Sequence, residues 1–269
     1  MSAEESATER SRIAIVTGGS RGLGRSTVLN LAKRGIRSIF TYNTSADEAK
    51  KVIELTRDEG ADAVALALDV GDIQSFREFG GLVRDALTGF GTDRFDILVN
   101  NAGTSHHASF ESVAEADLDR LFDVHFKGVF FLTQMLLPLM NEGGRIVNLS
   151  TGLTRITVPG SVAYASIKGA VEVLTRYLAK ELGPRRIAVN VVAPGAIATD
   201  FSGGMVRDNP EVNRRVSEMT ALGRPGEPED VGPMIAALVS DECGGLTVSG
   251  SKCRVGCPSD ARYNGASPL

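Results

Sequence analysis

The feature that most constrains the fold is a regular alternation of short apolar segments with longer helical ones. The segments with the character of buried strands are 12–17, 38–42, 63–68, 96–99, 145–150 and 187–192. Helices are expected at about 22–34, 45–59, 72–87, 114–140, 161–182 and 228–240. This order predicts right-handed crossovers and a parallel sheet covered by helices on both faces. Because no linker, repeat or low-complexity block divides the chain, we expect one doubly wound α/β domain of three layers.

Composition limits the possible partners. The chain has 269 residues, of which 42% are hydrophobic and 23% charged, a balance typical of a globular protein. The net charge of -4 argues against nucleic-acid binding, which needs a basic surface. The longest apolar runs are too short to cross a membrane. Residues 1–11 are polar and lack the apolar core of a signal peptide, so we expect a short disordered lead and a cytoplasmic protein.

A glycine-rich turn joins the first predicted strand to the first helix. It reads TGGSRGLG, with Gly18, Gly22 and Gly24 between the strand and the helix start. Glycine lets the backbone approach a pyrophosphate closely, and the helix N-terminus attracts its charge. The turn therefore favours a dinucleotide site, and the alternative is a glycine-rich turn without a ligand.

The stretch after the second predicted strand bears on the choice of cofactor. Enzymes that use NAD have an acidic residue there to hold the ribose 2′-hydroxyl. Here the sequence is TYNTS, with Asn43 and no acid, and Arg21 adds a cation from the glycine-rich turn. These residues favour NADPH, whose 2′-phosphate is negative. The alternative is that Arg21 is simply solvated.

Tyr164 and Lys168 stand four positions apart in a predicted helix and so share one face. Tyrosine is a poor acid near neutral pH because its reference pKa is about 10. A nearby ammonium lowers that pKa, so the pair is suited to donate a proton to a carbonyl oxygen or to remove one from an alcohol. Taken alone, the spacing is also common in surface pairs.

Further motifs follow the remaining predicted strands in order, at the strand ends where open α/β sheets bind ligands. They are Asp69-Val70, Asn100-Asn101-Ala102-Gly103, Ser150-Thr151 and Pro194-Gly195. With the glycine-rich turn and the Tyr/Lys pair, this combination resembles the short-chain dehydrogenase/reductase family over about residues 12–242. The resemblance implies a Rossmann-type fold, hydride transfer between NADPH and a small carbonyl or alcohol, and a homodimer or homotetramer.

The resemblance also implies residue roles. Asp69 and Val70 are expected to hold the adenine, and Asn43 to face the 2′-phosphate. Tyr164 is expected to be the general acid/base, and Lys168 to bind the nicotinamide ribose and lower the pKa of the tyrosine. The full set expected at the cofactor is Gly18, Ser20, Arg21, Gly22, Leu23, Gly24, Asn43, Asp69, Val70, Asn101, Gly103, Tyr164, Lys168, Ile197 and Thr199.

Two catalytic positions depart from the family pattern. Thr151 stands where the family has serine, and its hydroxyl still polarises a carbonyl if its stiffer side chain points correctly. His125 stands where the family has an asparagine that holds a relay water. A relay role and a buried structural role for His125 are equally open. His106 and His107 have no partners at metal-ligand spacing, so we expect no metal.

The tail, 243–269, departs further and holds every cysteine of the chain: Cys243, Cys253 and Cys257. The family pattern at this point resembles RWVNGQRIEVSGG. Codons for residues 243–257 can be chosen so that reading from the third base gives RWVNGQRIEVSGGL. We therefore hypothesise a one-base deletion near the Cys243 codon, and the alternative is a genuine divergent tail. The lost segment would have formed a further strand at the sheet edge and part of the subunit interface.

The leading functional hypothesis is an NADPH-dependent carbonyl reductase or alcohol dehydrogenase that uses Tyr164, Lys168, Thr151 and His125. One alternative is an NADP-binding protein with little or no turnover, because of the substituted positions and the altered tail. Another is an isomerase or epimerase, against which the missing acid after the second strand argues. The segment 201–222 is expected to cover the substrate, whose identity stays open.

Overall fold

The computed structural model describes residues 11–247, which fold around a six-stranded sheet. The strand order is β3-β2-β1-β4-β5-β6, and every pairing is parallel. This confirms the predicted doubly wound, Rossmann-type sheet. The strands are β1 (Ile13–Val16), β2 (Arg37–Tyr42), β3 (Ala63–Ala67), β4 (Phe95–Asn100), β5 (Met140–Leu149) and β6 (Ala188–Val192).

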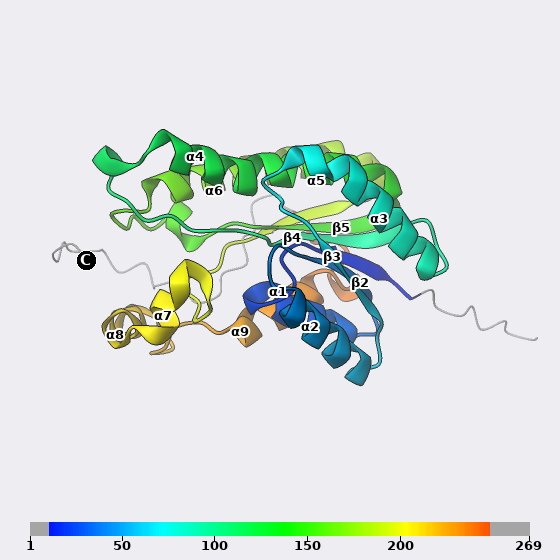
Figure 1. The fold of residues 1–269 in the computed structure, drawn as a ribbon, viewed down its shortest axis with the longest axis horizontal. Coiled ribbons are helices and arrows are strands. Elements are labelled where there is room, and N and C mark those ends of the chain that lie inside the picture. The colour runs from blue at the N-terminus through cyan, green and yellow to red at the C-terminus, as the bar shows by residue number, and fades with distance from the viewer. Residues whose placement is uncertain (1–10, 248–269) are drawn as a thin grey trace, which may run out of the picture.

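Helices form a layer on each face of the sheet (Figure 1). One layer contains α3 (Phe76–Gly89), α4 (Glu115–Phe122), α5 (Gly128–Leu136) and α6 (Val162–Glu181). The other contains α1 (Gly22–Ala32), α2 (Ala46–Asp58) and α9 (Pro228–Leu238). No helix among residues 11–247 is both long and apolar enough to cross a membrane.

The strands supply side chains to a hydrophobic core on each face. In β1, Ala14 and Val16 pack in the core that holds α1 and α9 residues such as Val28 and Ile235. The alternate residues Ile13 and Ile15 pack in the core on the α3 and α5 side. Side chains that alternate between two buried faces explain why the strands are apolar throughout.

The long helix expected over 114–140 is present as an uninterrupted helical run over 115–136, but it is not a uniform α-helix. The structure has α4, then a wider π turn at Asp123–Lys127, then α5, and then a short 3-10 turn at Leu137–Leu139. Pro138 lies in that last turn, and its missing N–H prevents the helix from continuing. The fifth strand therefore begins at Met140, earlier than predicted.

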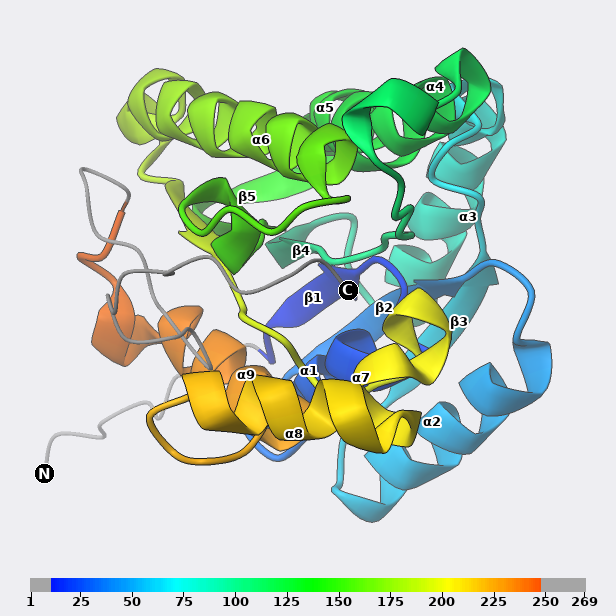
Figure 2. The ribbon, with the colours of Figure 1, turned by 90° about the vertical axis from the view of Figure 1, so that its left-hand side faces the viewer.

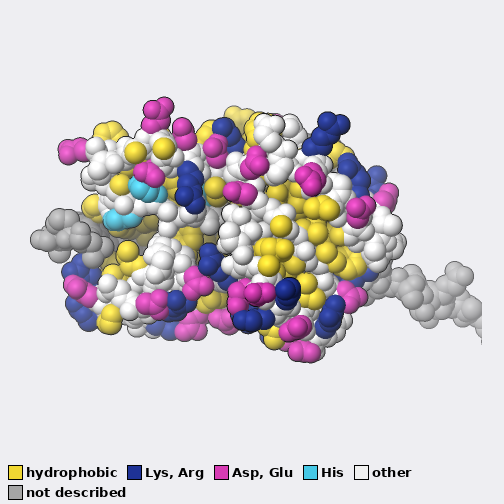
Figure 3. Space-filling view, in the orientation of Figure 1, with side chains coloured by type: hydrophobic (Ala, Val, Ile, Leu, Met, Phe, Trp, Pro, Cys, Tyr) yellow, Lys and Arg dark blue, Asp and Glu magenta, His cyan; other side chains and the backbone are white. Residues whose placement is uncertain are grey.

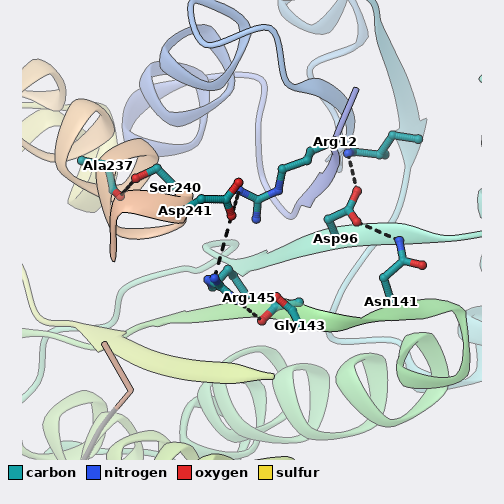
Figure 4. Close-up of polar contacts among 10 residues, drawn as sticks. Arg12, Asp96, Asn141, Gly143, Arg145, Ala237, Ser240 and Asp241 are labelled. Carbon is teal, nitrogen blue, oxygen red and sulfur yellow. Dashed lines mark hydrogen bonds and ion pairs between the residues drawn. The ribbon is translucent and has the colours of Figure 1, made fainter. Parts of the chain in front are cut away.

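Polar contacts join the amino ends of the strands, at the end of the sheet opposite the glycine-rich turn (Figure 4). Asp241, which follows α9, accepts from Nη1 of Arg12 at 3.3 Å and lies 3.9 Å from Nη2 of Arg145. Asn141 donates to Asp96 at 2.7 Å. These contacts tie the end of α9 to the starts of β1, β4 and β5. Burial, and then the Arg12 charge, lower the pKa of Arg145.

The β6 strand is the last one in the sheet over residues 11–247, and residues 246 and 247 meet its outer side. The Asn190 side chain donates to the Leu246 carbonyl at 2.8 Å, and the Val189 N–H donates to Oγ1 of Thr247 at 3.3 Å. The expected lead 1–11, apart from its last residue, and most of the tail 243–269 lie outside the described residues. The proposed domain boundaries and the deletion hypothesis therefore stay predictions.

The deletion hypothesis makes a direct prediction about stability. Inserting one base at the Cys243 codon should restore RWVNGQRIEVSGGL, and a strand from that segment would pair with the outer edge of β6. A gain of about 3 kcal/mol would raise the melting temperature by roughly 6–12 °C for a domain of this size. Calorimetry of the two chains measures it. An unchanged or lower melting temperature would mean that the present tail is native to this fold.

Candidate active site

One large cleft opens at the carboxyl ends of the strands, next to the β1/β4 crossover where the strand order reverses. In Figure 2, α4, α5 and α6 lie above the strands, and α7 (Met205–Asp208) and α8 (Pro210–Met219) lie below. Figure 3 shows the hollow, with histidine side chains on its upper rim. Its volume is about 2160 Å³. Sites for single small ligands are typically about 300–1,000 Å³, so the cleft has room for a dinucleotide and a substrate together.

The structure brings nearly all of the predicted site residues to this cleft. Gly24 alone among them does not line it. The residues that do are Gly18, Ser20, Arg21, Gly22, Leu23, Asn43, Asp69, Val70, Asn101, Gly103, His125, Thr151, Tyr164, Lys168, Ile197 and Thr199.

The glycine-rich turn has the backbone shape that the sequence suggested. Gly18 and Gly22 have positive φ angles of 67° and 53°, which only glycine adopts without strain. A Cβ on Gly24 would lie 2.1 Å from the Gly18 carbonyl oxygen, so this glycine allows the turn to pack on itself. Asn101 donates to the carbonyls of Thr17 at 2.8 Å and Gly18 at 3.1 Å. Its side chain therefore fixes the turn.

The same turn begins α1, and this helix start fits an anionic ligand. Arg21 is the N-cap residue, and the first turn of α1 contains no acidic side chain. The free N–H groups of a helix start and its dipole attract phosphate. Across the cleft, Asn43 follows β2 and is exposed. These residues fit a dinucleotide with a 2′-phosphate.

The α6 helix presents Tyr164 and Lys168 to the cleft, as their spacing predicted. Lys168 is buried, and its Nζ donates to the Leu149 carbonyl at 2.7 Å. That Nζ lies 5.8 Å from the centre of the Tyr164 ring. Thr151, two residues after the end of β5, is buried and lines the same cleft. Its Oγ1 accepts from the Leu153 N–H at 3.4 Å.

The pKa of Tyr164 moves opposite to the sequence-based expectation. Burial raises the pKa of Tyr164 above its ordinary value, and burial lowers the pKa of Lys168 to about 7. A lysine with this pKa is charged only part of the time near neutrality, so its ammonium does not outweigh the burial of the phenol. In the chain alone, the tyrosine is a protonated donor.

His125 lies in the π turn, with its ring edge-on to Tyr164 and the ring centres 5.1 Å apart. Its Nε2 lies 2.7 Å from the Thr104 carbonyl oxygen and 3.3 Å from the Thr104 N. The carbonyl can only accept and is the nearer of the two, so this geometry favours the tautomer with the proton on Nε2. Nδ1 is then an acceptor, and no hydrogen-bond partner for it is found among residues 11–247. A Cβ on Gly103 would lie 2.7 Å from this ring, so the glycine makes room for it. Burial, and then the Lys168 charge, lower the pKa of His125 well below its usual range.

The lowered pKa of His125 predicts how stability depends on pH. The unfolded chain binds a proton to this histidine below about pH 6.5, whereas the folded chain resists it. The contribution of neutral His125 to the free energy of unfolding is therefore complete above that pH. It is lost as the pH falls toward the pKa of His125 in the folded chain. The melting temperature of His125→Asn should fall less than that of the parent between about pH 7.5 and about pH 5. His107→Asn is the control, and equal slopes for parent and His125→Asn would contradict the prediction.

Two further side chains lie beside the predicted catalytic residues, and sequence reasoning missed the second of them. Phe201, which begins the segment expected to cover the substrate, has its ring centre 6.1 Å from that of Tyr164. Glu172 is buried on α6, one helical turn after Lys168, and accepts hydrogen bonds from the loop after β5. The available signal was its position four residues after Lys168, because that spacing places a charge on the same helix face.

A doubly wound sheet with a glycine-rich first turn and a Tyr/Lys pair in one cleft defines a class of dinucleotide-dependent dehydrogenases and reductases. A family model described as enoyl-(acyl carrier protein) reductase matches residues 18–255. The chain belongs to the short-chain dehydrogenase/reductase family.

Individual relatives agree with this assignment. An uncharacterized oxidoreductase of Methylorubrum extorquens is 37% identical over 236 residues, covering 88% of this chain and 93% of the relative. The promiscuous reductase LugOII, which performs a keto-reduction in lugdunomycin biosynthesis, superimposes with a TM-score of 0.85 at 36% identity, covering 90% and 95% of the two chains. The angucycline ketoreductase LanV, solved with bound NADP, gives 0.85 at 34% identity, covering 90% and 93%.

Proposed function

We propose that this protein is an NADPH-dependent reductase that converts a ketone to an alcohol. The observation that carries the proposal is that Tyr164, Lys168 and Thr151 meet in the cleft that also contains the glycine-rich turn. Carbonyl reduction needs a proton donor and a dinucleotide in one water-poor space. The arrangement supplies both.

Bound NADPH supplies the hydride. The Tyr164 hydroxyl, whose pKa is raised by burial, donates its proton to the carbonyl oxygen as negative charge develops there. The Thr151 hydroxyl donates a hydrogen bond to the same oxygen and orients it. Lys168 holds the cofactor ribose, and any positive charge on Nζ stabilises the phenolate that remains. We further propose that Nδ1 of His125 holds a water molecule that returns a proton to Tyr164.

The proposed substrate is a ketone on a flat, fused-ring skeleton. The substrate end of the cleft is lined by apolar side chains from three segments: Ile156, Val158, Phe201, Met205, Val206 and Met219. Apolar side chains contributed by three segments suit a rigid ring system. The structural neighbours LugOII and LanV are named for keto-reduction in lugdunomycin biosynthesis and for an angucycline substrate, which supports this choice.

The test is a fluorescence titration with NADPH and NADH, followed by turnover assays on a panel of linear and fused-ring ketones. We expect tighter binding of NADPH, because Arg21 and Asn43 face the 2′-phosphate. Arg21→Ala should reduce this preference. Binding of NADPH without turnover of any ketone would favour the alternative of a binding protein with little activity.

We also propose that two or more copies assemble through the outer face of α4, α5 and α6. This face exposes Leu118, Phe122, Phe130, Phe131, Val173 and Tyr177. Exposed apolar patches of this kind mark interfaces. Light scattering should therefore give a dimer or tetramer, and Phe131→Glu should reduce its size. Leu82→Glu on α3, at a comparably exposed site (41% against 40%), should leave it unchanged; a monomeric parent would contradict the proposal.

A further inference from the structure

We propose that Glu172 is the positioning residue that sets the direction of the Thr151 hydroxyl. The proposal rests on the carbonyl-reductase function above, and it adds a residue that neither the Tyr/Lys pair nor the cofactor site requires. Glu172 lies on α6 one helical turn after Lys168 and is 5% exposed. A carboxylate this deeply buried needs hydrogen-bond donors to offset its lost hydration.

Two of those donors flank Thr151. The Ser150 hydroxyl donates to Oε1 of Glu172 at 3.0 Å, and the Thr154 hydroxyl donates to the same oxygen at 2.8 Å. Ser150 immediately precedes Thr151, and Thr154 follows it within the short 3-10 turn Gly152–Thr154. One carboxylate oxygen therefore holds the backbone on both sides of the catalytic hydroxyl.

Backbone contacts fix the strand side of this loop, whereas side-chain contacts join its other side to α6. Lys168 binds the Leu149 carbonyl, and Glu172 binds the residues on both sides of Thr151. The Ser150 N–H donates to the Val192 carbonyl and the Gly152 N–H donates to the Pro194 carbonyl, each at 2.7 Å. These bonds fix the loop to β6 and the segment after it. On the opposite side, the hydroxyls of Ser150 and Thr154 reach α6 through Glu172. The carboxylate thus couples Thr151 to the helix that presents Tyr164 and Lys168.

This coupling matters because Thr151 and Tyr164 must reach the same carbonyl oxygen. A displacement of about 1 Å in such a group can lower the rate by roughly a hundredfold. The side chain of Thr151 has a restricted χ1, so its hydroxyl direction follows its backbone closely. Fixing the backbone on both sides of Thr151 therefore also fixes the direction of its hydroxyl.

The experiment combines Glu172→Leu and Glu172→Gln with Thr151→Ala and measures kcat, KM and NADPH affinity. Glu172→Leu should lower kcat for the ketone by about ten- to a hundredfold. NADPH affinity should stay within about twofold, well below a tenfold change of about 1.4 kcal/mol. Glu172→Gln keeps an acceptor oxygen and should restore most of the rate. In the Thr151→Ala background, Glu172→Leu should not lower kcat further, because the hydroxyl that Glu172 positions is already absent.

A second variant guards against misfolding of Glu172→Leu. Glu172→Leu combined with Ser150→Ala and Thr154→Val removes the carboxylate together with these two donors, so no hydroxyl is left facing a missing acceptor, and it should lower kcat by a similar factor. A kcat loss of the same size with and without Thr151 would overturn the positioning role. Failure of the proposed function looks different: the parent itself would then bind NADPH without turning over any ketone.

Discussion

Replacing Tyr164 with phenylalanine is expected to lower kcat for ketone reduction by about a hundred- to ten-thousandfold, the usual contribution of a positioned proton donor. In the proposed mechanism the phenol protonates the carbonyl oxygen, and Lys168 with its bond to the Leu149 carbonyl remains in place without it. The change removes one oxygen and keeps the ring that packs near His125 and Phe201. NADPH affinity and melting temperature should therefore stay close to those of the parent.

The matched control is Tyr177→Phe on the same helix. Tyr177 is 65% exposed and lies outside the cleft lining, so its hydroxyl has no part in the proposed reaction. Steady-state kinetics with saturating NADPH, together with a cofactor titration, separate the two variants. A Tyr164→Phe enzyme that keeps more than about a tenth of the parent kcat would show that another group supplies the proton.

The second large effect is expected from Gly24→Ala. A methyl group there would lie 2.1 Å from the Gly18 carbonyl oxygen and 2.6 Å from the Asn101 amide nitrogen. The Gly18 carbonyl is backbone, and the Asn101 amide is held by its hydrogen bonds to the Thr17 and Gly18 carbonyls, so the turn itself has to move. Such overpacking costs about 3 kcal/mol, which corresponds to more than a hundredfold in affinity if the cost falls on the cofactor-binding shape of the turn.

Gly81→Ala on α3 is the control for this substitution. No atom lies within 4 Å of the position that its Cβ would occupy, and alanine is better than glycine inside a helix by about 0.5–1 kcal/mol. The two variants should therefore shift urea denaturation in opposite directions, and only Gly24→Ala should lose NADPH binding in a fluorescence titration. Unchanged binding by Gly24→Ala would mean that the turn tolerates a wider shape.

The sequence was sufficient to predict the sheet because burial on both faces leaves an unmistakable pattern. The residues from Ile13 to Val16 are apolar without interruption. Such a run is typical of a strand that helices cover on both faces. The π turn within the long helix was not predictable in the same way. Apolar spacing continues across Asp123–Lys127, and a π turn adds one residue without changing composition.

All but one of the predicted site residues line the cleft, but their electrostatics were not predicted. Spacing brought Tyr164 and Lys168 to one helix face, whereas the degree of burial decides the direction of their pKa shifts. Gly24 is a second case in which the sequence indicates the position of a residue but not its surroundings. Its place in the motif was evident, yet only coordinates reveal that it contacts the turn itself rather than the open cleft.

The π turn between α4 and α5 gives the chain an unusual sensitivity to length. The π turn holds one residue more than an α-helical turn, and the dihedral angles at both of its ends are helical. Deleting one residue from 123–127 would therefore let the turn close to ordinary α geometry, while the flanking helices keep the faces that they present to the sheet and to the outer surface. His125 lies inside the turn and contacts Tyr164, so such a deletion should change the site and leave Phe130 and Phe131 on the outer face.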